Sequence, residues 1–142
     1  MFIRMLVVSA MLAAMLQAAT GCSRGPVSAP PQGQAAYDAL PVVTTDEQFQ
    51  QQVLASPKPV LVEFGTDWCH YCKDLAPTLG MLALEYQGRA VFVRVDGDRS
   101  SSLVHKYGVR GYPTVMVFRP GAKPVTLGGV HDAQDYRNAL GP

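Results

Sequence analysis

Hydrophobic residues follow two different periodicities along most of this chain. Continuous apolar runs rich in valine and phenylalanine predict buried strands at residues 60–64, 90–95 and 115–118. Between the first two runs, apolar side chains recur at steps of four, three and four, at Leu75, Leu79, Leu82 and Tyr86. That spacing places them on one face of a helix. Strands and helices are therefore expected to alternate.

The remaining segments extend this alternation. A hydroxyl residue followed by Asp46 and Glu47 is typical of a helix start, and Pro57 ends that helix. A short helix is expected to end at Gly108, a hairpin to follow with residues 125–127 as its second strand, and a last helix to begin near Asp132. With a weak strand near residues 40–43, the order is β-α-β-α-β-α-β-β-α. It predicts an α/β fold with a central mixed sheet covered by helices on both faces.

The N-terminal segment has a different character. Arg4 is the only charged residue before Arg24, and residues 5–19 are almost wholly apolar. As a helix, these residues would extend roughly 22 Å, which is short of the roughly 30 Å hydrocarbon core of a bilayer. We therefore predict that residues 1–21 are a secretory signal peptide rather than a membrane span.

Small residues lead from this segment to Cys22. The run Ala-Ala-Thr-Gly-Cys at residues 18–22 resembles the lipobox of bacterial lipoproteins. The resemblance implies that Cys22 is lipidated, becomes the new N-terminus and anchors the chain to a membrane. Ser23, which is not an aspartate, favours the outer over the inner membrane. The alternative is an ordinary cleaved signal that leaves Cys22 as a free thiol.

Composition separates a linker from a globular part. Residues 22–41 contain several prolines and glycines without apolar periodicity, so we predict a flexible tether, with a short strand near its end as the alternative. Residues 42–142 then form the folded domain. The whole chain carries twelve basic and eleven acidic residues, a formal charge of +1, without a block of like charge. This balance argues against a nucleic-acid partner.

The strongest chemical signal is the run Trp-Cys-His-Tyr-Cys-Lys at residues 68–73, directly after the first predicted strand. Cys69 and Cys72, two residues apart, can close a disulfide ring or share a metal ion. Export favours the disulfide, because disulfides persist in a periplasm-like compartment. A zinc site normally needs four ligands, and only His70 is an obvious third. We therefore predict no metal, while a purely structural disulfide remains an alternative.

Together with the order of elements, these residues resemble the thioredoxin superfamily over about residues 42–140. The resemblance is carried by residues 68–73, by Pro77 in the helix behind them, by residues 106–114 with Pro113, and by Gly128-Gly129. It implies a thioredoxin fold and a thiol–disulfide oxidoreductase that uses its cysteine pair and no other cofactor. It also implies protein thiols and disulfides as partners.

The helix start gives the two cysteines different roles. Amide groups and the helix dipole at an N-terminus stabilise a negative sulfur, and in such settings the thiol pKa falls from about 8.5 towards roughly 3.5–7.5. Cys69 is thus the expected nucleophile, and Cys72, one turn further on, the resolving thiol.

Glu63 interrupts the apolar strand six residues before Cys69. Burial would raise its pKa. The family carries an acid at the matching position that takes the proton of the resolving cysteine, so Glu63 is expected to serve Cys72 in this way. The alternative is that Glu63 points outward. The family also carries a lysine near this acid on the next strand, and Phe92 is expected at that position.

The resemblance assigns three residues to substrate positioning. Pro113 matches the family's cis-proline, which leaves the backbone of Tyr112 free to pair with an extended client chain. Trp68 is expected to shield one side of the site. Between the cysteines, His70 and Tyr71 are expected to tune the reduction potential. A protonated His70 would favour an oxidant, whereas a histidine turned to solvent would have little effect.

The residues around the cysteines look closest to thioredoxin-like domains that pass electrons to periplasmic proteins. We therefore expect an exported enzyme that reduces or interchanges protein disulfides on the periplasmic side of a bacterial membrane. A reductase would need a partner that renews its electrons, such as a membrane electron transporter. The alternative is a tethered, non-catalytic module that holds a client or a metal through Cys69, Cys72 and His70.

Overall fold

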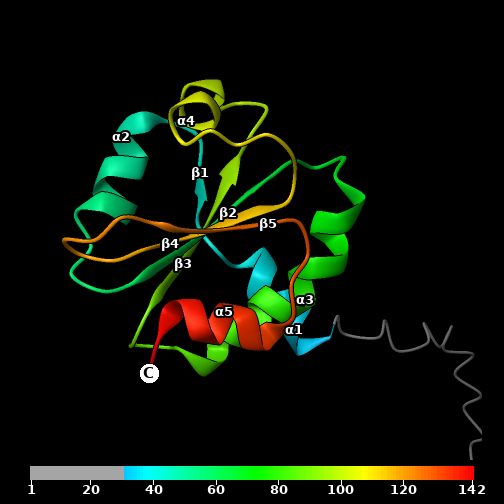
Figure 1. Cartoon of the computed structure of the whole chain (residues 1–142). Coiled ribbons are helices and arrows are strands. Elements are labelled where there is room, and N and C mark those ends of the chain that lie inside the picture. The colour runs from blue at the N-terminus through cyan, green and yellow to red at the C-terminus, as the bar shows by residue number, and fades with distance from the viewer. Residues whose placement is uncertain (1–30) are drawn as a thin grey trace, which may run out of the picture.

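Five strands form one mixed sheet in the computed structural model, which describes residues 31–142 (Figure 1). The strands are β1 (Val42–Val43), β2 (Val60–Gly65), β3 (Val91–Asp96), β4 (Thr114–Phe118) and β5 (Val125–Gly128). Their order across the sheet is β1-β3-β2-β4-β5. The strands β1, β3 and β2 run parallel, whereas β4 is antiparallel to both β2 and β5.

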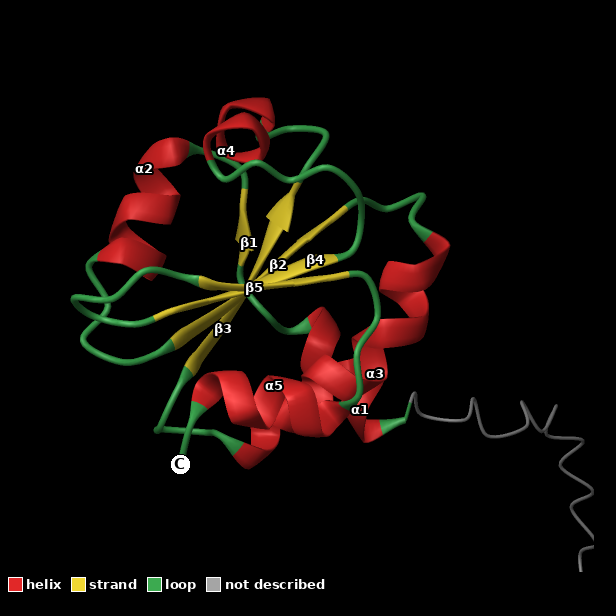
Figure 2. Cartoon of the chain, viewed as in Figure 1, coloured by secondary structure: helices red, strands yellow, loops and turns green. Residues whose placement is uncertain are grey.

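Helices cover both faces of this sheet (Figure 2). On one face lie α2 (Asp46–Phe49), continued by a π-helical turn at Gln50–Leu54, and α4 (Ser101–Lys106). On the other face lie α1 (Gln32–Asp38), α3 (His70–Glu85) and α5 (Ala133–Leu140). From residue 42 onward, the order of strands and helices is the predicted one. The prediction of a central mixed sheet with helices on both faces is confirmed.

The central strand β2 separates two hydrophobic cores. Val60, Val62 and Phe64 belong to the core under α2 and α4. Leu61 belongs to the core under α1, α3 and α5, and Glu63 shares its side of the strand because side chains alternate between faces. β2 is paired on both edges, so all its side chains from residue 60 to residue 64 are buried. A charged residue in this strand is therefore in the interior.

Local sequence signals fix several helix ends. The Thr45 side chain accepts a hydrogen bond from the Gln48 backbone N–H at 3.2 Å and so caps α2. Gly108 follows α4 with a φ of +64°, which a glycine adopts without steric cost. Asp132 stands at the N-cap of α5, as expected.

The prediction of a flexible tether over residues 22–41 is wrong for its last part. Gln32–Asp38 form α1, which packs along α3. The two helices approach closely at Gly33 and Gly80, where a Cβ on either glycine would meet the backbone of the other helix. A seven-residue helix is marginal in isolation, so α1 depends on this packing. The expected signal peptide, Cys22 and the tether up to residue 30 lie outside the described residues.

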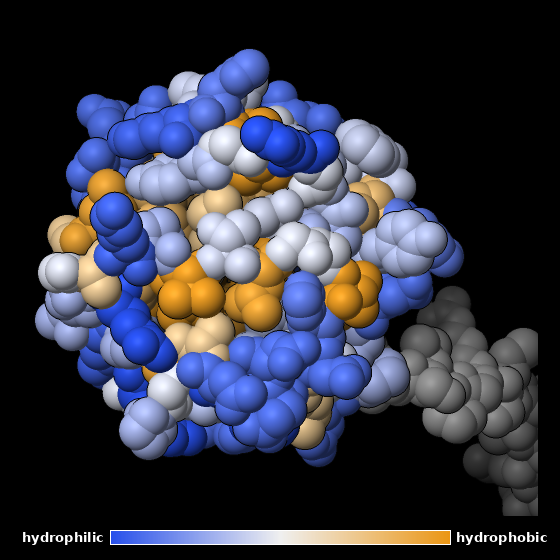
Figure 3. Space-filling view, viewed as in Figure 1, coloured by the Kyte–Doolittle hydropathy of each residue, from blue (hydrophilic) through white to orange (hydrophobic). Residues whose placement is uncertain are grey.

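The surface around the edge strand β5 is partly hydrophobic. Figure 3 shows hydrophobic side chains across the middle of this face, surrounded by hydrophilic ones. Val125 of β5 and Val130 are among the exposed large hydrophobic residues. Within residues 31–142, every helix is too short or too polar to cross a membrane.

Candidate active site

The cysteine pair lies where the chain passes from β2 into α3. Cys69 is the N-cap of α3, and its Sγ accepts a hydrogen bond from the Cys72 backbone N–H at 3.2 Å. The two sulfurs form a disulfide, with the Cα atoms 5.3 Å apart. Both side chains are buried. Cys69 thus faces the positive end of a sixteen-residue helix, where a thiolate is stabilised once the disulfide opens.

The loop before β4 contacts the residue that precedes this pair, because the Tyr112 ring lies 6.0 Å from that of Trp68. The Tyr112–Pro113 peptide bond is cis, as expected. The Pro113 carbonyl accepts a hydrogen bond from the Gly129 backbone N–H at 2.8 Å. Among the hydrogen bonds of residues 31–142, none uses the backbone of Tyr112. A hollow of about 380 Å³ adjoins this loop. It is lined by Gly108, Arg110, Gly111, Tyr112, Pro113, Thr114, Thr126, Gly128 and Gly129. An extended chain bound there can pair with Tyr112.

Trp68 connects the cysteine motif to both neighbouring loops. Its side chain is 68% exposed. The indole Nε1–H donates a hydrogen bond to Asp98 Oδ2 at 2.9 Å, and the ring meets that of Tyr112 edge to face at 6.0 Å. The structure therefore places Trp68 over one side of the site while leaving much of its surface open to solvent.

His70 and Tyr71 point into solvent. The His70 side chain is 83% exposed, and its Nε2 lies 3.7 Å from Asp74 Oδ2 on the next helical turn. The Tyr71 side chain is also exposed, with its ring 6.2 Å from that of His70. A charge on His70 is therefore accompanied by the Asp74 carboxylate and screened by water.

Glu63 is fully buried, with 1% of its surface exposed, so the alternative that it points outward is wrong. Its Oε2 accepts a hydrogen bond of 2.5 Å from the Tyr37 hydroxyl. Burial raises the pKa of Glu63 above its ordinary value, because a charged carboxylate loses its hydration. The Tyr37 hydrogen bond and the Arg94 charge act in the opposite direction.

The second carboxylate oxygen of Glu63 lies close to Cys72. A Cβ placed on Gly65 would be 3.2 Å from Cys72 Sγ and 3.3 Å from Glu63 Oε1, so these two atoms are at most 6.5 Å apart. Within the described residues, Oε1 has no hydrogen-bond partner. Both atoms thus lie beside Gly65, where a side chain would crowd them. Glu63 is thus a buried carboxylate beside Cys72, which is the position that a proton acceptor for this cysteine needs.

Arg94, not Phe92, occupies the position beside the acid. In the parallel pairing of β2 with β3, Phe92 stands opposite Leu61 and Arg94 opposite Glu63. The Arg94 guanidinium lies 4.4 Å from the centre of the Tyr37 ring. The prediction for Phe92 was therefore wrong by two residues. Register between two strands depends on their pairing, which the sequence of either strand alone does not specify.

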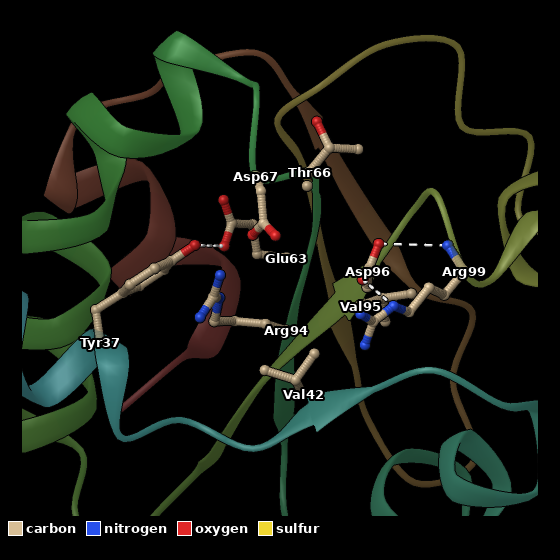
Figure 4. Close-up of a pocket in the computed structure, with 10 residues that line it drawn as sticks. Tyr37, Val42, Glu63, Thr66, Asp67, Arg94, Val95, Asp96 and Arg99 are labelled. Atoms are coloured by element: carbon tan, nitrogen blue, oxygen red, sulfur yellow. Dashed lines mark hydrogen bonds and ion pairs between the residues drawn. The ribbon is translucent and has the colours of Figure 1, made fainter.

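A hollow of about 260 Å³ leads from this carboxylate to the surface (Figure 4). Tyr37, Glu63 and Arg94 point toward one another from α1, β2 and β3. The remaining lining residues are Val42, Gly65, Thr66, Asp67, Val95, Asp96 and Arg99. Asp67 and Arg99 are exposed, so protons accepted by Glu63 can reach bulk water.

Sequence reasoning missed Tyr37 and Arg94. Arg94 carried a signal, because it is a single charge within an apolar strand, as Glu63 is. Tyr37 carried none, since it lies in a segment without hydrophobic periodicity. In the part of the chain from residue 31 onward, no three His, Cys, Asp or Glu side chains cluster as a metal site would require.

Comparison with known proteins identifies the family. The family model "Thioredoxin" matches residues 40–141. The thioredoxin of Allochromatium vinosum is 40% identical over 94 residues, which cover 66% of this chain and 88% of that protein. The thioredoxin of Pseudomonas aeruginosa is 41% identical over 88 residues, covering 62% of this chain and 82% of the relative. Protein disulfide-isomerase 2-3 of Arabidopsis thaliana is 40% identical over 99 residues, covering 69% of this chain and 22% of that protein.

A solved structure supports the same fold. It comes from a study of thiol resolution in yeast mitochondrial 1-Cys peroxiredoxin via glutathione/thioredoxin systems. One of its chains superposes with a TM-score of 0.67 at 20% identity, covering 74% of this chain and 96% of that one. Thioredoxin-family proteins act on protein thiols and disulfides through redox-active cysteines, without a further cofactor. With Cys69 and Cys72 at disulfide distance, this chain belongs to the thioredoxin family and is a thiol–disulfide oxidoreductase.

Proposed function

We propose that this oxidoreductase reduces or interchanges disulfides of proteins in the bacterial cell envelope. The observation that carries the proposal is the position of Cys69 at the N-terminus of α3, one turn before Cys72 and next to Trp68, whose ring meets that of Tyr112 in the loop of Pro113. The first cysteine can then hold a client while the second remains within reach of its sulfur.

In the first step the reduced enzyme opens a client disulfide. The Cys69 thiolate attacks one sulfur of the client, and the client's S–S bond breaks as the Cys69–client bond forms. The second client sulfur leaves with the electron pair and takes up a proton from solvent. The helix N-terminus favours this step because it stabilises the thiolate form of Cys69.

In the second step Cys72 releases the client. Its thiol proton passes to Glu63 Oε1, and the Cys72 thiolate attacks the Cys69 Sγ of the mixed disulfide. The Cys69–Cys72 bond forms, the Cys69–client bond breaks, and the client sulfur leaves as a thiolate that is then protonated. The client gains two electrons and the enzyme loses two. A dithiol donor must restore them, and we propose a membrane electron transporter.

Client recognition is proposed to depend on the backbone of Tyr112. A client segment would add a short strand-like pairing at this position, so that recognition is largely independent of the client's sequence. The exposed rings of Trp68 and Tyr71 adjoin the cysteines and supply apolar contact. This arrangement suits unfolded or extended protein substrates.

The environment of His70 favours a reductase. A histidinium held against Cys69 would stabilise the thiolate and make the disulfide more oxidising. In the structure, His70 is exposed and lies beside Asp74. We expect a reduction potential closer to the about −270 mV of thioredoxin than to the about −120 mV of a strong periplasmic oxidant. Equilibration with glutathione measures it, and His70→Ala should change it little. A potential near the oxidant value would contradict the reductase assignment.

The envelope location rests on the N-terminal sequence. The single Arg4, the apolar residues 5–19 and the Gly21-Cys22 pair support export and a lipid anchor on Cys22, with Ser23 favouring the outer membrane. An anchored enzyme would stay on the periplasmic side, where client disulfides form.

Thiol release from a protein disulfide substrate tests the catalytic proposal. The wild-type protein should reduce the substrate in the presence of a dithiol donor, whereas Cys69→Ser should be inactive. Cys72→Ser should accumulate a disulfide-linked complex with the substrate through Cys69, visible on a non-reducing gel. If Cys69→Ser retains activity, or Cys72→Ser traps no client, the assigned roles are wrong.

A further inference from the structure

Tyr37 brings a hydroxyl to the redox site from outside the family domain. It lies in α1, whereas the thioredoxin family model matches residues 40–141. Its ring is buried, 6% exposed, against α3 and the sheet. Its hydroxyl donates to Glu63 Oε2 across 26 residues of chain. A residue of the preceding segment therefore completes the surroundings of the buried carboxylate.

The two oxygens of Glu63 have different partners. Oε2 accepts the hydrogen bond of Tyr37, while Oε1 has no hydrogen-bond partner among residues 31–142 and lies, like Cys72 Sγ, beside Gly65. A carboxylate free to rotate would exchange its two oxygens. The bond to Tyr37 removes that freedom and holds Oε1 on the side of the sulfur.

Arg94 lies against the ring of Tyr37. Its guanidinium lies 4.4 Å from the centre of the Tyr37 ring, and its strand position is opposite Glu63. Figure 4 shows the three side chains pointing toward one another from three elements. Tyr37 therefore has a partner for its ring as well as for its hydroxyl, which is unlike a tyrosine that only fills space.

We propose that Tyr37 is a positioning residue for disulfide resolution: it orients Glu63 so that Oε1 accepts the proton of Cys72. The inference rests on the proposed role of Glu63. Under this proposal α1 contributes to disulfide resolution, because the Tyr37 hydroxyl reaches Glu63 only while α1 is packed on α3.

Several other titratable or charged groups face Glu63 or line its hollow. They are Arg94 from β3, Cys72 from α3, Tyr136 from α5, and Asp67, Asp96 and Arg99 along the hollow. Hydrogen-bond donation from Tyr37 lowers the pKa of Glu63, so loss of the hydroxyl raises that pKa. A larger fraction of Glu63 is then protonated at a given pH and unable to accept a proton.

The test separates the two chemical steps. Reduced protein carrying Cys22→Ser, which leaves Cys69 and Cys72 as its cysteines, is mixed with an aryl disulfide that releases a coloured thiolate. Attack by Cys69 releases the first aryl thiolate and resolution by Cys72 the second, so stopped-flow absorbance gives both rates. Tyr86→Phe is the matched control. It removes a hydroxyl from the same core, one that donates to the Gly141 carbonyl at 3.2 Å and does not touch Glu63.

We expect Tyr37→Phe to leave the first phase unchanged and to slow the second roughly tenfold near neutral pH, a part of the ~100-fold or more that a positioned base contributes. The pH midpoint of the second phase should move upward. Tyr86→Phe should match the parent protein in both phases. A second phase of Tyr37→Phe with the parental rate and midpoint overturns the inference.

Two further measurements keep the outcomes distinct. If Glu63→Gln leaves the second phase unchanged, the proposed role of Glu63 is wrong and the Tyr37 inference falls with it. If only Glu63→Gln slows the second phase, Tyr37 alone is misassigned. In the unsubstituted protein, the Tyr37 hydroxyl proton and the Glu63 carboxyl carbon should titrate together by NMR. Independent titration overturns the inference even if Tyr37→Phe does not fold.

Discussion

Glu63 is a carboxylate in a strand whose neighbours from residue 60 to residue 64 are buried and hydrophobic. An ionised carboxylate in such a place loses hydration, and one hydrogen bond from Tyr37 and the charge of Arg94 offset this loss only in part. The folded protein therefore binds a proton at Glu63 more readily than the unfolded chain does. The proposed role of Glu63 as proton acceptor for Cys72 gives a reason for a residue with this cost in the strand.

Replacement of this acid should stabilise the protein at neutral pH. Because the folded-state pKa of Glu63 is raised above its ordinary value of 4.5, the native state holds more protons above that pH, and stability falls as pH rises. A pKa difference of one between the folded and unfolded states corresponds to about 1.4 kcal/mol once Glu63 is ionised in both. Glu63→Gln should therefore be more stable than wild type at neutral pH, with a difference that disappears toward pH 4.5. Urea unfolding between about pH 4 and about pH 8 measures it.

Glu85→Gln serves as the control, because the pKa of Glu85 is shifted in the direction opposite to that of Glu63. Glu85 is on the surface, and its hydrogen bonds to Arg137 lower its pKa, so its contribution to stability is lost as pH falls. Its replacement should give no gain at neutral pH. A Glu63→Gln variant that is less stable than wild type at every pH would contradict the interpretation of Glu63 as a costly buried charge.

Gly65 lies beside both Glu63 and Cys72. A Cβ there would lie 3.2 Å from the sulfur and 3.3 Å from Oε1, so it would crowd the two groups between which the proton is proposed to move. Gly65→Ala should slow the Cys72 step about tenfold or more, since a positioned base contributes roughly 100-fold, and leave the Cys69 step unchanged. The two-phase thiolate-release measurement checks this. Equal slowing of both phases would indicate a general distortion of the site instead.

At the level of elements, the structure depends on the close contact of α1 with α3. Gly33 and Gly80 bring the two backbones together, and Tyr37 then reaches the sheet. α1 has no side chain that caps its N-terminus by a hydrogen bond, and no acidic residue in its first turn. The local sequence thus contributes little to the stability of α1, and this helix forms because α3 is present to pack against it.

Gly80→Ala should destabilise the protein although alanine favours helices. The added methyl would meet the Gly33 carbonyl, and such overpacking costs about 1–3 kcal/mol, against a gain of about 1 kcal/mol in helix propensity. Urea unfolding gives the change in stability. Amide hydrogen exchange should show loss of protection in α1 while β2 and β4 stay protected. A Gly80→Ala variant that is more stable than wild type, with α1 still protected, would show that α1 and α3 can move apart without a loss of stability.

At the level of the whole molecule, the sheet topology brings the site together. β2 and β3 are parallel, so Gly65 and Asp96 end at the same edge, and the antiparallel β4 begins there with Thr114. The cysteine motif, the loop with Asp98 and the loop with Pro113 consequently meet at this edge, and the Trp68 contacts with Asp98 and Tyr112 join them. The scaffold therefore assembles the site from three separate loops.

At the same level, the N-terminal sequence predicts that the whole chain is attached to a membrane through a lipid on Cys22. Wild-type protein expressed in a bacterium should incorporate labelled fatty acid and fractionate with membranes, and Cys22→Ser should lose both. Cys69→Ser provides the control, since it removes a cysteine without changing the lipobox-like run. A wild-type protein without label would exclude the lipid anchor and leave Cys22 as a free thiol.

The sequence alone predicted most of the fold and the central chemistry. The periodicities at 60–64 and at Leu75 to Tyr86 defined a strand and a helix, because burial on one face enforces a period of two or of about 3.6 residues. The cysteine spacing placed both sulfurs on one helical turn, and the Tyr112–Pro113 bond is cis as expected. These features depend on residues that are close in the chain.

Only the tertiary structure decided the surroundings of Glu63. The helix at Gln32–Asp38 forms through contact with α3, and Tyr37 lies 26 positions before Glu63 in the chain. Arg94 rather than Phe92 stands beside the acid because of strand register. Such contacts depend on which elements pack together, and neither propensity nor periodicity in one segment specifies its partner. The sequence determined which sulfurs react, and the packing of α1, β2 and β3 determined what surrounds the acid beside them.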